Sequence, residues 1–224
     1  DLLRAHGWFE DATRQYETLA RLAPDDGSVA LLLAAAAEGQ GKLESAVKWS
    51  EQAGSAGDPG QLGSPASTAR AFAATYLAWG RLDAMTQHRD DEAKAITARL
   101  TRVMATETRR NAHGARVSLT WSHPELHPTL WSNALGAPMP APEGDVTLGI
   151  AAVVLPARSG VVVEVRLSPD EVEHAARLGA QAVLTASFAE EGDAAKVVKL
   201  PIGFAIGSSG VKRFSVEKGT VREL

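Results

Sequence analysis

The feature that most constrains the fold is a pattern that returns after 34 residues. Gly7 recurs as Gly41, and Ala12 recurs as Ala46. A glycine in the turn between two helices, a small residue where the helices cross and a closing proline are the elements of a stacked helical hairpin. Such a hairpin cannot bury its apolar face alone, so it stacks on neighbours and leaves a concave surface for a partner. The repeat therefore predicts a helical array that binds another molecule, and it argues against catalysis.

The first unit resembles the tetratricopeptide repeat (TPR). The period of that family is 34 residues, and its small, aromatic and proline positions match Ala12, Tyr16 and Pro24. The resemblance covers residues 1–60, and in the second unit Ser50 stands in place of the aromatic residue. It implies protein binding or scaffolding, without indicating a particular partner.

A third helical hairpin is predicted from Ser67 to about Arg110, with Gly80 opening a segment that echoes the one at Gly41. Residues 81–110 contain neither proline nor glycine, and their apolar residues recur at steps of three and four. This spacing predicts one long amphipathic helix over about 81–110. The helical part is expected to span residues 1–110.

After residues 111–114 the period of the pattern changes from 3.6 to two. Apolar and polar residues alternate over 116–121 and 161–167, which predicts strands that are apolar on one face. Further strands are predicted at 146–155, 182–188, 195–200 and 211–216. A short helix is expected where Ser168 can act as cap, Pro169 is the first helical residue and Glu171 lies in the first turn. Six or seven strands in this length predict an antiparallel β-sandwich over residues 115–224.

The segment Arg116–Trp121, placed directly after TPR-like helices, resembles the opening strand of a terminal β-sandwich in certain bacterial proteins. Those proteins join a von Willebrand factor A domain to helical repeats. Their module follows the Trp with an aspartate-rich segment, whereas 122–128 contains no Asp, so ion binding is not carried over. The predicted fold class is α+β multidomain, with TPR-like α-hairpin repeats followed by an antiparallel β-sandwich. Because the sequence opens inside a helical pattern, we expect a fragment of a larger protein.

Composition and charge exclude several classes of function. The chain of 224 residues carries a net charge of −4, which argues against a nucleic-acid platform. It contains no cysteine, which excludes disulfides, thiolate metal sites and a cysteine nucleophile. No apolar run approaches the roughly 18 residues of a membrane span, so direct membrane insertion is not expected.

Candidate catalytic and metal-binding motifs have simpler explanations. His123 and His127 are four residues apart, but Pro124 and Pro128 disfavour the helix that would place both on one metal. The segment 39–42 lacks the Ser or Thr and the preceding strand of a phosphate loop. No Gly-x-Ser-x-Gly elbow occurs. We therefore predict no metal, no cofactor and no enzymatic activity.

The predicted binding residues depend on which part of the chain meets the partner. A protein partner would lie in the groove formed by the first helix of each hairpin, which carries Arg4, Ser28, Glu38 and Arg70. The alternative is a carbohydrate- or polymer-binding accessory module that uses the β-sandwich. Its candidate residues are Trp121 and Trp131, since aromatic faces stack on sugar rings.

The remaining aromatic residues are predicted to pack between the helices. The expected core members are Trp8, Tyr16, Phe72, Tyr76 and Trp79. Trp49 is the aromatic side chain most expected to be exposed, because polar residues follow it and the first unit has no counterpart.

Overall fold

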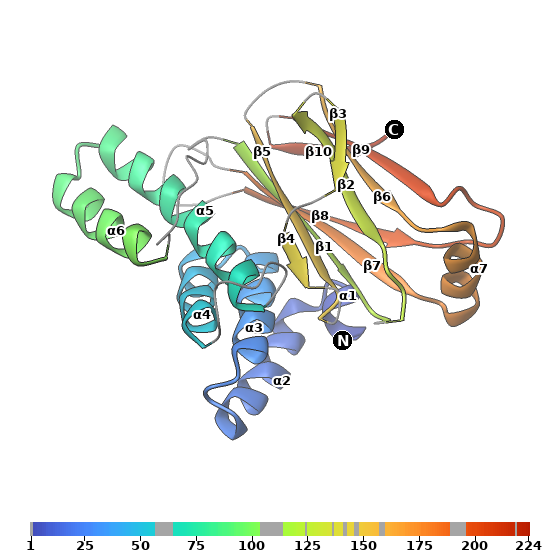
Figure 1. Ribbon diagram of the computed structural model, residues 1–224, viewed down its shortest axis with the longest axis horizontal. Coiled ribbons are helices and arrows are strands. Elements are labelled where there is room, and N and C mark those ends of the chain that lie inside the picture. The colour runs from blue at the N-terminus through green and yellow to red at the C-terminus, as the bar shows by residue number, and fades with distance from the viewer. Residues whose placement is uncertain are drawn as a thin grey trace.

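The computed structural model describes a mixed α+β protein in which helices precede antiparallel strands (Figure 1). The helices within residues 2–103 lie together on one side of two β-sheets, whereas the helix Pro169–Leu178 lies at the far end of the sheets from them. The described residues are 2–56, 65–103, 114–123, 125–135, 137–140, 143–145, 148–156, 160–188, 196–217 and 219–224.

The helical part consists of three consecutive pairs of helices. The pairs are α1 (Leu2–Ala5) with α2 (Phe9–Leu22), α3 (Gly27–Gly39) with α4 (Leu43–Ser55), and α5 (Pro65–Thr86) with α6 (Asp90–Val103). Within the array, α2 packs on α3 and α4 packs on α5. Ala12 and Ala46, which the repeat places where helices meet, are 1% and 0% exposed.

The same turn closes the first helix of every pair. Gly7 and Gly41 both have a φ of 75°, and His88 has a φ of 57°. In each turn the next residue donates its backbone N–H to a carbonyl five residues earlier, as in a Schellman motif. These bonds are Trp8 N–H to Leu3 O (2.9 Å), Lys42 N–H to Ala37 O (2.9 Å) and Arg89 N–H to Ala84 O (2.8 Å).

The third turn shows that the predicted long helix over 81–110 is wrong. The chain leaves α5 at Thr86 and starts α6 at Asp90, and Gly80 lies inside α5 instead of opening a turn. At this break His88 adopts the left-handed conformation that is usually found at glycine. Because a histidine occupies the position, no glycine marks the break in the sequence. Arg89 helps to hold the turn by pairing with Asp83 before it and with Glu92 after it. Residues 104–110 lie outside the described part of the chain.

The strands form two antiparallel sheets. Sheet A has the order β4-β5-β1-β7-β8, and sheet B has the order β10-β9-β6-β2-β3. The strands are β1 (Gly114–Trp121), β2 (Thr129–Leu135), β3 (Ala137–Pro140), β4 (Glu143–Asp145), β5 (Ile150–Pro156), β6 (Val161–Arg166), β7 (Gln181–Phe188), β8 (Lys196–Gly203), β9 (Val211–Glu217) and β10 (Thr220–Glu223). All six predicted strands are found with shifted ends, whereas β2, β3, β4 and β10 were not predicted.

The predicted short helix is α7 (Pro169–Leu178), between β6 and β7. Ser168 Oγ accepts the backbone N–H of Glu171, and the Glu171 carboxylate accepts the backbone N–H of Ser168. This reciprocal capping box satisfies two backbone donors at the start of the helix. Gly179 ends the helix with a φ of 64°, so both ends of α7 are fixed by local sequence.

The facing sides of the two sheets share one apolar core. It combines inward residues of sheet A with inward residues of sheet B, including Val117, Leu119, Leu155, Leu184, Val163, Val165, Phe214 and Val216. Each of these side chains is at most 4% exposed. Burial of this apolar surface is the main stabilising contribution to the β part.

The other face of sheet A lies against the helices. Val183 of β7 packs with residues of α2 and α3, and Ile150 of β5 packs with residues of α3, α4 and α5. Five polar side chains on this face are also buried: Arg116, Ser118, Thr120, Thr185 and Ser187. Helices that are far away in sequence therefore cover this face of sheet A.

Most of the aromatic residues assigned to the helical core are found there. Tyr16, Phe72, Tyr76 and Trp79 are buried. Trp8 is 56% exposed, so its assignment to the core is wrong. Trp49, expected to be exposed, is partly buried and packs against three clusters of the helical part.

Candidate functional site

Two of the predicted groove residues are buried between the helices and sheet A. Arg4 and Glu38 are 34 positions apart and occupy the same place before the turns at Gly7 and Gly41. They are 0% and 1% exposed. Arg4 donates from Nη2 to the backbone carbonyl of Leu148 at 2.5 Å. Burial lowers the pKa of Arg4, and the nearby Tyr16 partly offsets that shift.

Glu38 is the centre of a buried polar network that joins α3, α5 and β1. Its Oε1 accepts hydrogen bonds from Arg116 Nη1 at 2.6 Å and from the Tyr76 hydroxyl at 2.5 Å. Its Oε2 accepts one from Ser118 Oγ at 3.2 Å. The Arg116 guanidinium also lies 4.0 Å from the ring centroid of Phe72. Burial, together with the neighbouring Glu38 carboxylate, raises the pKa of Tyr76 well above its usual range, so this hydroxyl is a proton donor.

The inner face of the helical array is therefore not an open groove. Arg4 and Glu38 point at this chain's own sheet, which corrects the expectation that they face a partner. Ser28 lies at the start of α3, where its backbone N–H is accepted by Asp26 Oδ1 at 2.8 Å. Its backbone takes part in capping the helix.

Arg70 differs from the other predicted groove residues because it lines an open cavity. The cavity measures about 340 Å³ and lies between α4, α5 and α6; it is lined by Glu51, Gln52, Gly54, Ser55, Arg70, Arg99, Arg102 and Val103. Arg70 Nε donates to Gly54 O at 2.8 Å. A Cβ at Gly54 would lie 2.8 Å from Arg70 Cγ, so the missing side chain lets Arg70 lie across α4.

A second arginine of this cavity is also held in place. Arg99 donates from Nε and Nη2 to the two carboxylate oxygens of Glu51, at 3.1 and 2.7 Å. That bidentate bond raises the pKa of Arg99. With Arg70 and Arg102, the cavity has three guanidinium groups and one carboxylate in its lining. The net positive charge of this lining suits a carboxylate or phosphate group on a partner.

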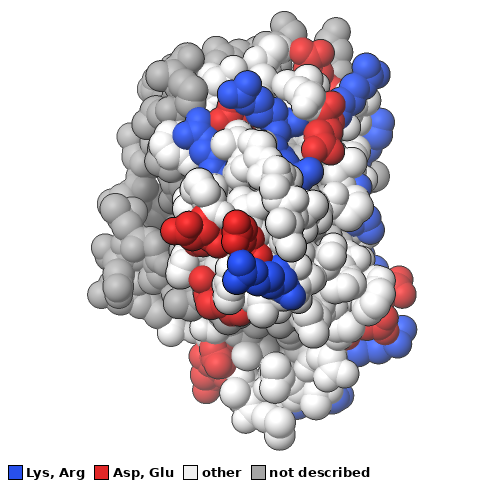
Figure 2. Space-filling view, turned by 90° about the vertical axis from the view of Figure 1, so that its right-hand side faces the viewer, with Lys and Arg blue, Asp and Glu red and all other residues white. Residues whose placement is uncertain are grey.

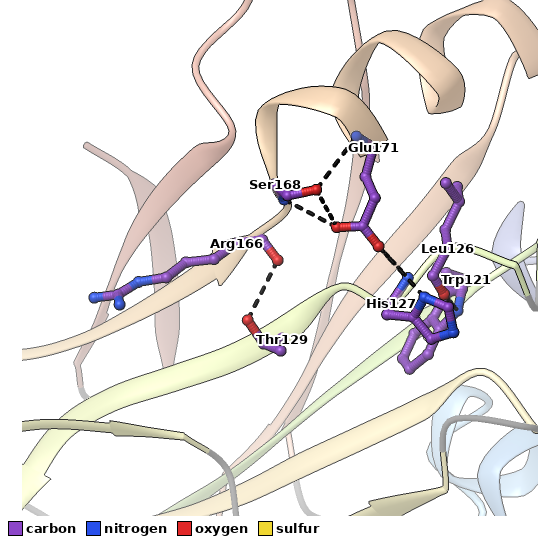
Figure 3. Close-up of polar contacts among 7 residues, drawn as sticks. All are labelled: Trp121, Leu126, His127, Thr129, Arg166, Ser168 and Glu171. Atoms are coloured by element: carbon purple, nitrogen blue, oxygen red, sulfur yellow. Dashed lines mark hydrogen bonds and ion pairs between the residues drawn. The ribbon is translucent and has the colours of Figure 1, made fainter.

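Trp121 does not offer a surface for stacking. It is 2% exposed and belongs to the core between the sheets. Its indole N–H donates to the carbonyl of Leu126 at 3.0 Å (Figure 3). Trp121 therefore anchors the loop between β1 and β2 from inside, which corrects its assignment as a sugar-binding residue.

The same loop is tied to α7 through Glu171. Its Oε1 accepts the backbone N–H of His127 at 3.0 Å, while its Oε2 accepts from Ser168 (Figure 3). Partial burial opposes ionisation, but the hydrogen bonds from Ser168 and His127 lower the pKa of Glu171. His123 pairs with Ser122 Oγ through Nδ1 at 2.6 Å. In the described ranges no three His, Cys, Asp or Glu side chains gather as a metal site would require.

Trp131 lies on the outer face of sheet B. A hollow of about 240 Å³ is lined there by Trp131, Ser132, Asn133, Val162, Glu164, Arg213 and Leu224. The Arg166 guanidinium lies 4.1 Å from the centroid of the Trp131 ring. Glu164 accepts hydrogen bonds from Arg166 and pairs with Arg213 at 3.0 Å. Trp121 is buried between the two sheets, whereas Trp131 lies on the outer face of sheet B. The two tryptophans therefore do not form one binding site.

The surface at the end of the sheets where α7 lies carries side chains of both positive and negative charge. Lys and Arg side chains alternate with Asp and Glu side chains over this face (Figure 2). One such pair is Arg177 with Glu173 on α7, at 2.9 Å. Separately, no described helix is both long and apolar enough to cross a lipid bilayer.

The sequence reasoning missed the residues that complete these sites. Arg116 and Ser118 lie on the polar side of the strand predicted over 116–121, but the burial of that side was not predicted, and neither Glu51 nor Arg99 was a predicted site residue. One signal was present for the buried network: Glu38 is the only charged residue in the alanine- and leucine-rich helix α3. A lone charge in an apolar helix implies a buried partner. Comparison of the chain with protein-family models, with curated proteins and with solved structures finds no match.

Proposed function

We propose that the chain is a non-catalytic protein interaction and scaffolding module. In this proposal three TPR-like hairpins are closed onto one face of an antiparallel β-sandwich. The equal turns at Gly7, Gly41 and His88 support the first element, and the apolar core shared by the two sheets supports the second. The observation that carries the proposal is the buried Glu38–Arg116 pair, because it fixes the helices and the β part as one unit.

The inner face of the hairpins is used within the chain, so a protein partner has to bind elsewhere. The cavity between α4, α5 and α6 is the best candidate among the described surfaces, because Arg70 and Arg99 are held in fixed positions there. Preorganised guanidinium groups bind an acidic group with little loss of side-chain freedom. We assign this cavity as the contact surface for an acidic segment of a protein partner.

The assignment is tested by capturing partners from the native source with matched baits. The baits are the parent chain, Arg70→Gln with Arg102→Gln, and the control Arg177→Gln, which removes an exposed arginine charge from α7. A partner retained by the parent and the control should be lost from the Arg70/Arg102 variant, with unchanged circular dichroism. Equal recovery by all three baits would exclude the cavity as the contact surface.

A second candidate function is sugar binding through the outer face of sheet B. The hollow beside Trp131 favours it, because the ring lies next to the fixed carboxylate of Glu164 and the exposed guanidinium of Arg213. Aromatic faces and paired charged groups are the usual components of a small-molecule site. Trp131→Ala should abolish retention on immobilised polysaccharides, whereas Trp8→Ala, which removes another exposed indole, should not. Retention that survives Trp131→Ala would rule this function out.

A further inference from the structure

The cavity between α4, α5 and α6 holds more hydrogen-bond donors than the chain itself uses. A guanidinium group carries five N–H donors and no acceptor. Arg70 donates from Nε to the Gly54 carbonyl at 2.8 Å, and Arg102 donates from Nε to the Ala98 carbonyl at 3.4 Å. Within the described ranges, the Nη atoms of these two arginines donate to no other residue. Both terminal groups are therefore available to a ligand.

The charges of the cavity leave a positive excess of two. Glu51 is the one carboxylate among the described residues of the lining, and both of its oxygens accept from Arg99. This pair cancels one of the three positive charges, so Arg70 and Arg102 remain. The carbonyl of Gly54 near the end of α4 would repel an anion, but Arg70 Nε covers it. A ligand that neutralises this lining carries two negative charges.

A phosphate monoester matches these two charges better than a carboxylate does. At pH 7 it carries a charge of about −1.5 to −2 and offers three strong acceptor oxygens. A carboxylate has one charge and two oxygens, which one guanidinium already satisfies in a bidentate bond. The second arginine would then keep its charge without a partner. The fixed fork of an arginine also fits the geometry of phosphate oxygens.

We propose that this cavity binds a phosphorylated serine or threonine side chain in the acidic segment of a protein partner. The inference rests on the proposed function: it names the anion that the partner supplies and makes the contact dependent on phosphorylation. The cavity of about 340 Å³ is much larger than the roughly 30 Å³ that one water occupies in the liquid, so it has room for the side chain that carries the phosphate. A lipid surface fits less well, because none of the exposed large apolar side chains among the described residues lies on α4 or α6.

The first experiment compares three blocked synthetic peptides, Ala-Ala-X-Ala-Ala, with phosphoserine, glutamate or serine at X. Binding is followed by NMR through the backbone amide signals of residues 51–55 and 99–103. The phosphoserine peptide should bind about tenfold more tightly than the glutamate peptide, since it makes one further charge-assisted contact. The serine peptide should not bind. Arg70→Gln with Arg102→Gln should lose the phosphoserine peptide, whereas the control Arg177→Gln should retain it.

The pH dependence of binding separates the two anions. The second pKa of a phosphate monoester is about 6, so the group gains its second charge between about pH 5.5 and 7.5, a range in which a glutamate side chain is already ionised. The charged groups that face the ligand are Glu51 of α4, Arg70 of α5, and Arg99 and Arg102 of α6, and no histidine is among the described lining residues. The phosphoserine peptide should therefore bind several-fold more tightly at the higher pH, and the glutamate peptide should bind equally at both.

Glu51→Gln gives a test that a loss of folding cannot imitate. The change removes the carboxylate of the lining and releases Arg99 from its bidentate pair. A third guanidinium group then faces the ligand, so the phosphoserine peptide should bind more tightly to this variant than to the parent. An affinity that does not increase would overturn the proposed position of the phosphate.

The other outcomes identify a different ligand. Equal affinities for the phosphoserine and glutamate peptides, both lost in Arg70→Gln with Arg102→Gln, would overturn this inference and leave the acidic contact of the proposed function standing. Binding of neither peptide would also overturn it, while partner capture by the matched baits tests the proposed function separately. Inorganic phosphate that binds as tightly as the phosphopeptide, or retention by vesicles that contain phosphatidic acid, would exclude a protein as the source of the phosphate.

Discussion

The two faces of sheet A are buried by different chemistry. The face toward sheet B is apolar, with Val117 and Leu119 of β1 in the shared core. The face toward the helices is mixed: Arg116, Ser118 and Thr120 of the same strand are buried there as deeply, next to the apolar Ile150 and Val183. An apolar face contributes mainly through area removed from water. A polar face contributes only when every group finds its partner, so the helices can cover sheet A in few orientations.

The largest expected change in unfolding free energy comes from removing one member of the buried ion pair on the face toward the helices. Glu38→Leu leaves Arg116 without its carboxylate, and such a change costs about 3–5 kcal/mol of unfolding free energy. Arg116→Met in the same protein should recover most of that loss, because the unpaired charge is then gone. Urea denaturation of both variants measures this. A cost for Glu38→Leu that Arg116→Met leaves unchanged would mean that Glu38 acts through its packing alone.

The apolar face should respond differently to the same experiment. Leu119→Ala removes a fully buried side chain from the core between the sheets and should cost about 2–5 kcal/mol. Arg116→Met should not restore this loss, because the cavity is on the opposite side of β1. Recovery of stability in that double variant would show that the two faces of sheet A are not energetically distinct.

The smallest expected effect is the change of folding stability with pH that arises from two buried tyrosines, Tyr76 and Tyr16. Burial raises the pKa of Tyr76 and of Tyr16, whereas tyrosine in the unfolded chain ionises near pH 10. Above about pH 10 the unfolded state therefore loses these protons while the folded state keeps them, so stability falls as pH rises. Tyr76→Phe should make that fall less steep, with Tyr16 supplying the remainder. An identical slope in the parent and in Tyr76→Phe, measured by urea denaturation from pH 8 to 11, would contradict a buried Tyr76.

The sequence predicted which residues share a face, but it could not predict what covers that face. Alternation over 116–121 correctly separated Val117 and Leu119 from Arg116 and Ser118, because side chains on a strand point to opposite sides. The same pattern is typical of a sheet with one face in water. The covering helices are far away in sequence, and only the lone charge at Glu38 hinted at a buried partner.

Local chemistry explains the other agreements and failures. Ser168, Pro169 and Glu171 supply a complete helix start, so α7 was predicted from its own residues. The break at His88 was missed, since a non-glycine residue holds the left-handed position there. Strand β2 was missed because its pairing with β3 is irregular between Ser132 and Leu135, which weakens the alternation that marks a strand.

The most direct test of the account is the accessibility of the polar face of sheet A. The chain has no cysteine, so Ser187→Cys places a single thiol on β7 at a position that is 0% exposed. Ser208→Cys, in an exposed turn, is the matched control. The account predicts that a thiol reagent modifies Cys at position 208 at once and modifies Cys at position 187 only as fast as the protein unfolds. Modification of both thiols at the same rate in the folded protein would show that the helices do not cover this face.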